Sequence, residues 1–95
     1  MSNSQVHVDP ERLKSFAAEL DQFANRVTDY DEGLQSALHR LGETFRDQEY
    51  EEFKTHFGAS SQLLRRFVEE VKKNVPKLVA DAEIIAMSQK VKPNI

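Results

Sequence analysis

The stretch that decides the fold is residues 10–42, PERLKSFAAELDQFANRVTDYDEGLQSALHRLG. Its apolar residues recur in steps of three and four without a break, at Leu13, Phe16, Leu20, Phe23, Val27, Tyr30, Leu34, Ala37 and Leu41. That spacing is the heptad pattern of a helix with one apolar side, and we call such a row a seam. The pattern predicts a helix over about residues 10–41.

Both ends of this first helix carry sequence signals. Asp9 precedes Pro10; Asp accepts hydrogen bonds from the free N–H groups of a helix start, and Pro has the φ of the first helical position. Val8 and Leu13 stand at the spacing of a hydrophobic staple across that start. Gly42 follows the last seam residue, where a glycine at the C′ position commonly ends a helix.

A second seam follows a short link of about residues 42–47, in which Thr44 and Asp47 both have side chains suited to an N-cap. The seam predicts a helix over about residues 48–86. Its members again follow steps of three and four at first, then wider steps, at Tyr50, Phe53, Phe57, Ser60, Leu64, Phe67, Val71, Leu78 and Ile85.

Polar residues and a proline mark the last part of the second helix. Pro76 removes an internal hydrogen bond, which predicts a kink or a break near residues 75–76. Asn74 and Asp81 interrupt the seam, so this end of the protein is expected to pack less well or differently. Residues 90–95 are expected to form a C-terminal tail.

Two long helices joined by a short link predict an all-α fold, an antiparallel helical hairpin forming one domain over residues 1–95. A lone hairpin cannot cover the apolar surface of both seams, and each buried Leu or Phe is worth about 1.5–3 kcal/mol. We therefore expect dimerisation into a four-helix bundle, either as a homodimer or as a heterodimer with a related hairpin. The expected dimer seam consists of Leu13, Phe16, Leu20, Phe23, Val27, Leu34, Leu64, Phe67 and Val71.

Composition excludes several classes of protein. The 95 residues include no cysteine, so neither a disulfide framework nor a thiolate metal site can form. No run approaches the roughly 18 apolar residues of a membrane span, and the N-terminal residues lack the pattern of a cleavable signal peptide. The net charge of −3 argues against general nucleic-acid binding. We expect a protein without membrane insertion that is cytoplasmic, or is secreted without a cleavable signal peptide.

A search for chemistry finds no catalytic site in the sequence. Glycine-rich phosphate loops and nucleophile elbows are missing, and no polar group of the seams is placed near another. Glu52 and His56 stand four apart rather than at the Glu-x-x-His spacing of di-metal bundles, and they are read as surface residues. We therefore expect no enzyme, no cofactor and no metal.

A row of basic residues on the second helix has an ordinary explanation. Glu69 and Glu70 interleave with it at helical spacings, which is typical of a solvated face laced with ion pairs. The row is therefore not read as a nucleic-acid surface; its members are Arg65, Arg66, Lys72, Lys73 and Lys77.

The aromatic residues around the link are the unusual feature. Leu41, Phe45, Asp47, Phe53 and Phe57 together resemble the core of the WXG family, small ESAT-like helical hairpins associated with type VII secretion. In that family a Leu precedes a Trp-any-Gly turn, and aromatic residues follow about eight and twelve positions after the Trp. Here Phe45 occupies the Trp position and Asp47 the Gly position. The resemblance implies that these five residues form a turn motif and partner-binding site.

The resemblance covers about residues 6–86, including a lead-in Val-x-Val-Asp-Pro at residues 6–10. The family's Tyr-x-x-x-Asp or Glu export signal has no counterpart, since Tyr30 is followed four later by Leu34, and Tyr50 by a lysine. The resemblance implies a non-enzymatic secretion substrate, or a partner that escorts a larger effector to the secretion machinery. The alternative is a cytoplasmic chaperone or structural adaptor whose hairpin completes a bundle with another protein.

Overall fold

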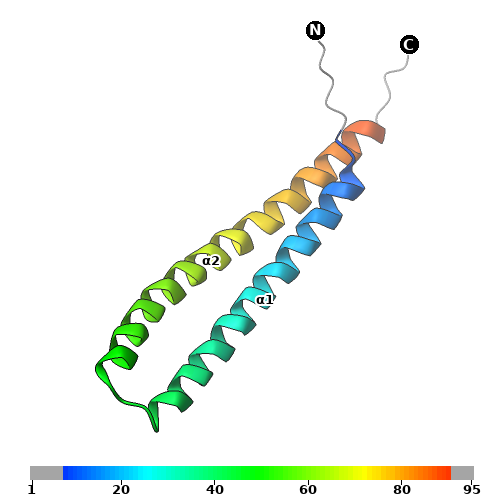
Figure 1. Ribbon diagram of the computed structural model, residues 1–95. Coiled ribbons are helices and arrows are strands. Elements are labelled where there is room, and N and C mark those ends of the chain that lie inside the picture. Colours follow the sequence, from blue (N-terminus) through cyan, green and yellow to red (C-terminus); the bar gives the residue numbers. More distant parts are fainter. Residues whose placement is uncertain (1–7, 91–95) are drawn as a thin grey trace, which may run out of the picture.

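The computed structural model describes residues 8–90 and contains two antiparallel helices, α1 (Pro10–Gly42) and α2 (Gln48–Lys90). Figure 1 shows them side by side, with the link at one end of the molecule and both chain ends at the other. The molecule is elongated, with extents of 77 × 26 × 15 Å. The expected all-α hairpin is confirmed. Its dimerisation stays a prediction, and Val6, His7 and the tail after Lys90 lie outside the described residues.

Acidic caps begin both helices. Asp9 Oδ1 accepts a hydrogen bond from the backbone N–H of Glu11 at 2.9 Å, and Pro10 is the first helical residue. At the start of α2, Asp47 Oδ1 accepts from the backbone N–H of Tyr50 at 2.8 Å. Of the two caps that the sequence offered for α2, Asp47 is therefore the one used, because its side chain satisfies an N–H that the first helical turn leaves free.

Gly42 differs from its expected role. It is the last residue of α1 rather than a C′ glycine beyond it, and Glu43 follows in the right-handed region at φ −68°. What requires glycine here is space, because a Cβ built on Gly42 would clash with the phenol ring and hydroxyl of Tyr50. The Tyr50 hydroxyl donates to the Leu38 carbonyl oxygen at 3.1 Å, which ties the start of α2 to the end of α1.

Small side chains line the terminal half of the hairpin, which comprises residues 10–27 of α1 and 68–90 of α2. Ala17, Ala24 and Ala82 are fully buried between the helices, and Val71 is 7% exposed. Side chains of this size let two helices approach closely along a continuous line. The sequence left open whether this end packs less well or differently, and it packs differently, through these small side chains. The Asn74 side chain bonds back to its own helix, at the Glu70 carbonyl oxygen, instead of entering the interface.

Pro76 does not end α2, which continues to Lys90. Proline lacks the N–H that would bond to the carbonyl four residues earlier, and this loss alone disfavours a helix interior. Here Val75 and Leu78 are half-buried and Ala82 is fully buried. Packing of these side chains stabilises the helix across the missing bond, since tertiary contacts rather than intrinsic propensity supply most helical stability.

A polar cluster lies between the helices in the turn half of the hairpin, residues 28–67. Asp31 and Ser61 are each 4% exposed. The Ser61 hydroxyl donates to Asp31 Oδ2 at 2.8 Å, and Gln35 Nε2 lies 2.8 Å from both Asp31 Oδ2 and Ser61 Oγ. This corrects two expectations: polar groups do meet inside the seam, and the buried serine is Ser61, while Ser60 is exposed.

Candidate protein-binding surface

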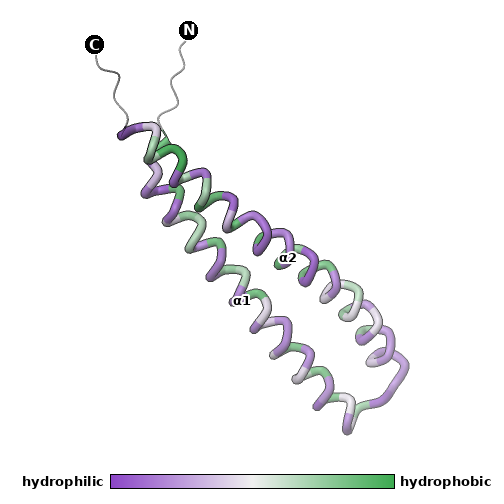
Figure 2. Tube along the Cα trace, turned by 180° about the vertical axis from the view of Figure 1, so that it is seen from behind, coloured by the Kyte–Doolittle hydropathy of each residue, from purple (hydrophilic) through white to green (hydrophobic). Residues whose placement is uncertain are grey.

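The two apolar seams are only partly used inside the hairpin. Figure 2 shows hydrophobic and hydrophilic residues alternating along both helices, as expected for amphipathic helices. Of the expected dimer seam, Leu13, Leu20, Val27 and Val71 are buried or half-buried in the single hairpin. A second group of large apolar side chains is 41–73% exposed, and we call it the apolar face: Phe16, Phe23, Tyr30, Leu34, Leu41, Phe53, Leu64 and Phe67.

Helical spacing places the α1 members of the apolar face in one stripe. Phe16, Phe23 and Tyr30 are seven residues apart, as are Leu34 and Leu41. Residues seven apart lie almost above one another on an α-helix. The stripe runs along one flank of the buried line, so its side chains reach solvent rather than α2.

An aromatic pair joins the exposed stripes of the two helices. The rings of Phe23 and Phe67 lie edge to face, with centroids 6.1 Å apart and an interplanar angle of 84°. The contact shows that the stripe of α1 and that of α2 lie on the same side of the hairpin. Both rings remain nearly half exposed, at 45% for Phe23 and 44% for Phe67. An exposed surface of this size and composition is typical of protein–protein contact.

The five residues of the turn motif do not form one cluster. Phe53 and Phe57 stack, with ring centroids 6.1 Å apart and 23° between the planes. Phe45 lies in the link, 47% exposed, and its N–H donates to the Leu41 carbonyl oxygen at 2.9 Å. Asp47 serves as the helix cap. Leu41, Phe45 and Phe53 thus present open apolar surface at the turn, whereas Phe57 is half-buried.

The opposite side of the hairpin is polar. Lys72 Nζ bonds to Asp21 Oδ1 at 2.8 Å and to Asn25 Oδ1 at 2.7 Å, and Arg65 Nε lies 3.8 Å from Asp31 Oδ2. These basic residues therefore pair across the two helices, whereas the sequence suggested pairing with glutamates of their own helix. Among residues 8–90, Lys73 alone of the row pairs in that way, with Glu70 at 3.6 Å. Three of the five basic residues of the row therefore take part in ion pairs.

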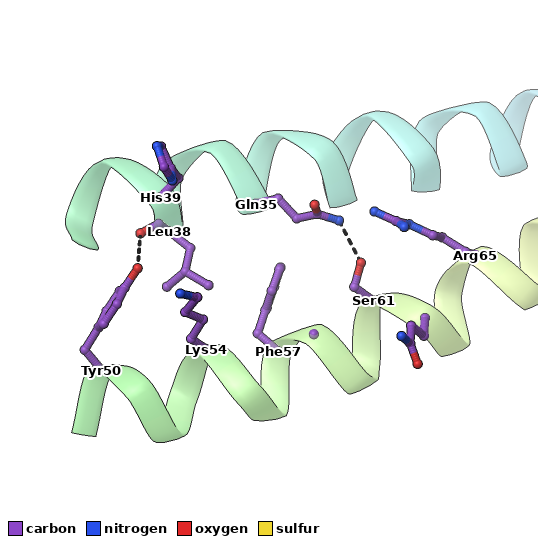
Figure 3. Close-up of a pocket in the computed structure, with 10 residues that line it drawn as sticks. Gln35, Leu38, His39, Tyr50, Lys54, Phe57, Ser61 and Arg65 are labelled. Carbon is purple, nitrogen blue, oxygen red and sulfur yellow. Dashed lines mark hydrogen bonds between the residues drawn. The ribbon is translucent and has the colours of Figure 1, made fainter. Parts of the chain in front are cut away.

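A cleft of about 450 Å³ opens between the helices in the turn half. Figure 3 shows its walls, with Gln35 and Leu38 from α1 facing Tyr50, Phe57 and Ser61 from α2. The Lys54 and Arg65 side chains extend from α2 into the space between the helices. Within residues 8–90, no group of three or more His, Cys, Asp or Glu could hold a metal ion. The hairpin thus has two open surfaces, an apolar face on one side and a polar cleft on the other.

The sequence analysis did not predict the polar cluster of Asp31, Gln35 and Ser61, although the spacing of residues on α1 indicates it. Ala17, Ala24, Asp31 and Leu38 follow one another at intervals of seven. Three of these four are small or apolar, and the line continues the most buried side of α1. An aspartate on such a line has to find hydrogen-bond partners on the facing helix, because a buried charge without them is strongly unfavourable.

Comparisons with known proteins identify the fold. No family model and no curated protein sequence matches the chain. Among solved structures, the hairpin is similar to the crystal structure of a mutant of the secreted protein EsxB from Bacillus anthracis str. Sterne. The TM-score is 0.74 at 14% sequence identity, and the match covers 96% of this chain and 100% of that one. EsxB is a WXG-type, ESAT-like protein, so the resemblance drawn from the turn motif is confirmed at the level of the fold. Neither helix contains a stretch apolar and long enough for a transmembrane span.

Proposed function

We propose that this chain is a non-enzymatic WXG-like protein of type VII secretion, which acts by binding other proteins and dimerises through its apolar face into a four-helix bundle. The exposed apolar face carries the proposal. Eight large apolar side chains, each 41–73% exposed, follow one side of both helices. The likeness in fold to a secreted protein over nearly the whole chain supports the association with secretion.

Pairing of two hairpins through this face explains why so much of the seam remains open in one of them. The fully buried core of one hairpin consists of three alanines, and no large side chain among the described residues is fully buried. Phe16, Phe23 and Phe67 are each about half exposed, so covering each of them would contribute about half of the roughly 1.5–3 kcal/mol that full burial of such a side chain is worth. A second hairpin supplies an apolar stripe of the same length, which a two-fold axis would align with the first.

Charge substitutions test the dimer. Phe67→Lys on the apolar face should convert the dimer into a monomer, as read by light scattering after size exclusion at micromolar concentration, because a buried charge without a partner opposes association. The matched control is Met87→Lys: Met87 is also on α2, is 67% exposed, and stands 20 residues after Phe67, which at 3.6 residues per turn places it on nearly the opposite side of that helix. If the unsubstituted protein is a stably folded monomer, or if both variants behave alike, the proposed interface is wrong.

Location in cells tests the association with secretion. The intact protein should appear in the culture supernatant of its own host, and deletion of the gene for the secretion ATPase should abolish that appearance. Retention in the cell together with specific copurification of another protein would instead support the cytoplasmic adaptor. The same test includes the variant Phe45→Ala, because Phe45 is exposed at the turn. This variant should reduce export or partner capture and leave the melting temperature nearly unchanged.

A further inference from the structure

We propose that the cleft between the helices in the turn half binds an extended acidic segment of a partner protein, with an apolar side chain between two carboxylates. The cleft opens on the polar side of the hairpin, opposite the apolar face. It is therefore free in the single chain and stays free in a dimer formed through the apolar face. The inference rests on the geometry of the cleft and does not require the proposed secretion role.

The charge of the cleft is opposite to that of the whole chain. The protein has a net charge of −3, yet none of the ten residues that line the cleft is acidic. Lys54 and Arg65 are cationic, and His39 adds a third basic side chain. Carboxylates are the natural partners of such a surface, because complementary charge favours both encounter and orientation.

Lys54 and Arg65 both have N–H donors available for a ligand. Lys54 takes part in none of the ion pairs found within residues 8–90. Arg65 approaches Asp31 only through Nε, at 3.8 Å, and its side chain is 63% exposed. A guanidinium has five N–H donors in a planar fork, so Arg65 retains donors that suit a second carboxylate.

The spacing of the cleft gives the shape of its ligand. Lys54 and Arg65 are eleven residues apart on α2, which places their Cα atoms roughly 16 Å apart along the helix axis. An extended chain spans that distance in about five residues. Between the two cations lies the side chain of Phe57, and Leu38 extends from α1 toward Lys54. A ligand that matches this arrangement has a carboxylate for each cation and an apolar side chain between the two carboxylates.

Two glycines provide a matched pair of variants. Gly58 lines the cleft, and a Cβ built on it meets nothing within 4 Å. Gly33 is also helical and also open, but it lies outside the cleft. Gly58→Leu should fill the cleft without a clash in the fold, and Gly33→Leu adds the same side chain elsewhere. Retained helicity in circular dichroism and retained elution in size exclusion separate loss of the cleft from loss of the fold or of the dimer.

Tyrosine fluorescence reports on the cleft directly. The chain has no tryptophan and only two tyrosines, of which Tyr50 lines the cleft. In a Tyr30→Phe background Tyr50 is the sole emitter. The probe is a blocked peptide without aromatic residues, in which serine, leucine and serine separate the two glutamates, so that the glutamates and the leucine share one face of the extended chain. Its control has glutamines in place of the glutamates.

The glutamate peptide should change the emission of Tyr50 in a saturable manner. Lys54→Met should weaken this binding at least tenfold and Gly58→Leu should abolish it, whereas Lys77→Met and Gly33→Leu should leave it unchanged. Binding should also weaken as the salt concentration rises, because the contacts are between exposed charges. Equal binding of the glutamine peptide, absence of binding by either peptide, or equal binding by the two glycine variants would overturn the proposal, whatever the result of the dimer and secretion tests.

Discussion

The two halves of the hairpin hold their helices together in different ways. In the terminal half, three alanines and Val71 form a row of buried apolar side chains between α1 and α2. In the turn half, the same side of α1 carries Asp31 and Gln35, which bond to Ser61, and a cleft of about 450 Å³ opens beside them. Small apolar side chains give close packing along one line. Hydrogen bonds between longer polar side chains fix the alignment of the helices without excluding open space.

The difference also bears on stability. Asp31 Oδ1 is buried and finds no hydrogen-bond partner among the described residues, so the polar cluster contributes less than a fully satisfied network would. Its directional bonds nevertheless select one alignment of α1 against α2, a role that buried polar residues perform in other helical assemblies. The terminal half holds the two helices in close contact, and the turn half contains the cleft.

The largest effect is expected from overpacking the terminal half. Ala24→Leu adds three carbons where no space is open, since Ala24 is fully buried. We expect a loss of about 3 kcal/mol in the free energy of unfolding, measured by denaturant titration at a fixed protein concentration. The control is Ala18→Leu on the exposed side of α1, which should change stability by less than about 0.5 kcal/mol. Similar losses for both would mean that the helices are not in close contact at Ala24.

The polar cluster should give the next largest effect. Ser61→Ala removes a donor to Asp31 and an acceptor for Gln35, and we expect a loss of about 2 kcal/mol because buried polar groups lose their partners. Ser60→Ala, one position earlier on the exposed side, should be nearly neutral. The two variants also distinguish the structure, in which Ser61 is buried, from the sequence pattern, which placed Ser60 in the seam. A larger loss for Ser60→Ala would favour that pattern.

A smaller loss is expected at the end of α1. Gly42→Ala places a Cβ against the ring of Tyr50, and we expect a loss of about 1.5 kcal/mol from the forced shift. Gly33→Ala, in open space on the same helix, should instead raise the free energy of unfolding by about 0.4–1 kcal/mol, because alanine restricts the unfolded chain more than glycine. Thermal melts of both variants give the comparison, and stabilisation by Gly42→Ala would exclude the close approach of Tyr50.

The smallest effect is expected from the ion pair that crosses the helices. Lys72 and Asp21 are 2.8 Å apart, with side chains 40% and 39% exposed. Lys72→Met should lower the free energy of unfolding by less than about 1 kcal/mol, and the difference should shrink in high salt. A loss as large as that of Ser61→Ala would show that charge, rather than small-residue packing, clamps the terminal half.

The two helices, the cap at Asp9 and the hairpin could be predicted from the sequence, because they follow from hydrophobic spacing and local hydrogen bonding. For the second helix the sequence offered both Thr44 and Asp47 as caps, and the structure uses Asp47. The sequence also located the open aromatic residues near the turn. Which part of each seam faces the other helix could not be predicted in this way. A seam is wider than one interface, and its period does not say whether Phe23 or Ala24 lies at the centre.

That choice depends on how closely the two helix axes approach, which is a property of the pair. The close approach buries Ala17, Ala24 and Ala82 and leaves the phenylalanines outside. With the helices in this arrangement, α2 continues past Pro76 and Tyr50 packs against Gly42. Ser61, rather than Ser60, bonds to Asp31. None of these contacts is local in sequence, so helical periodicity could not specify them, and the cleft that they border exists only once the helices have met.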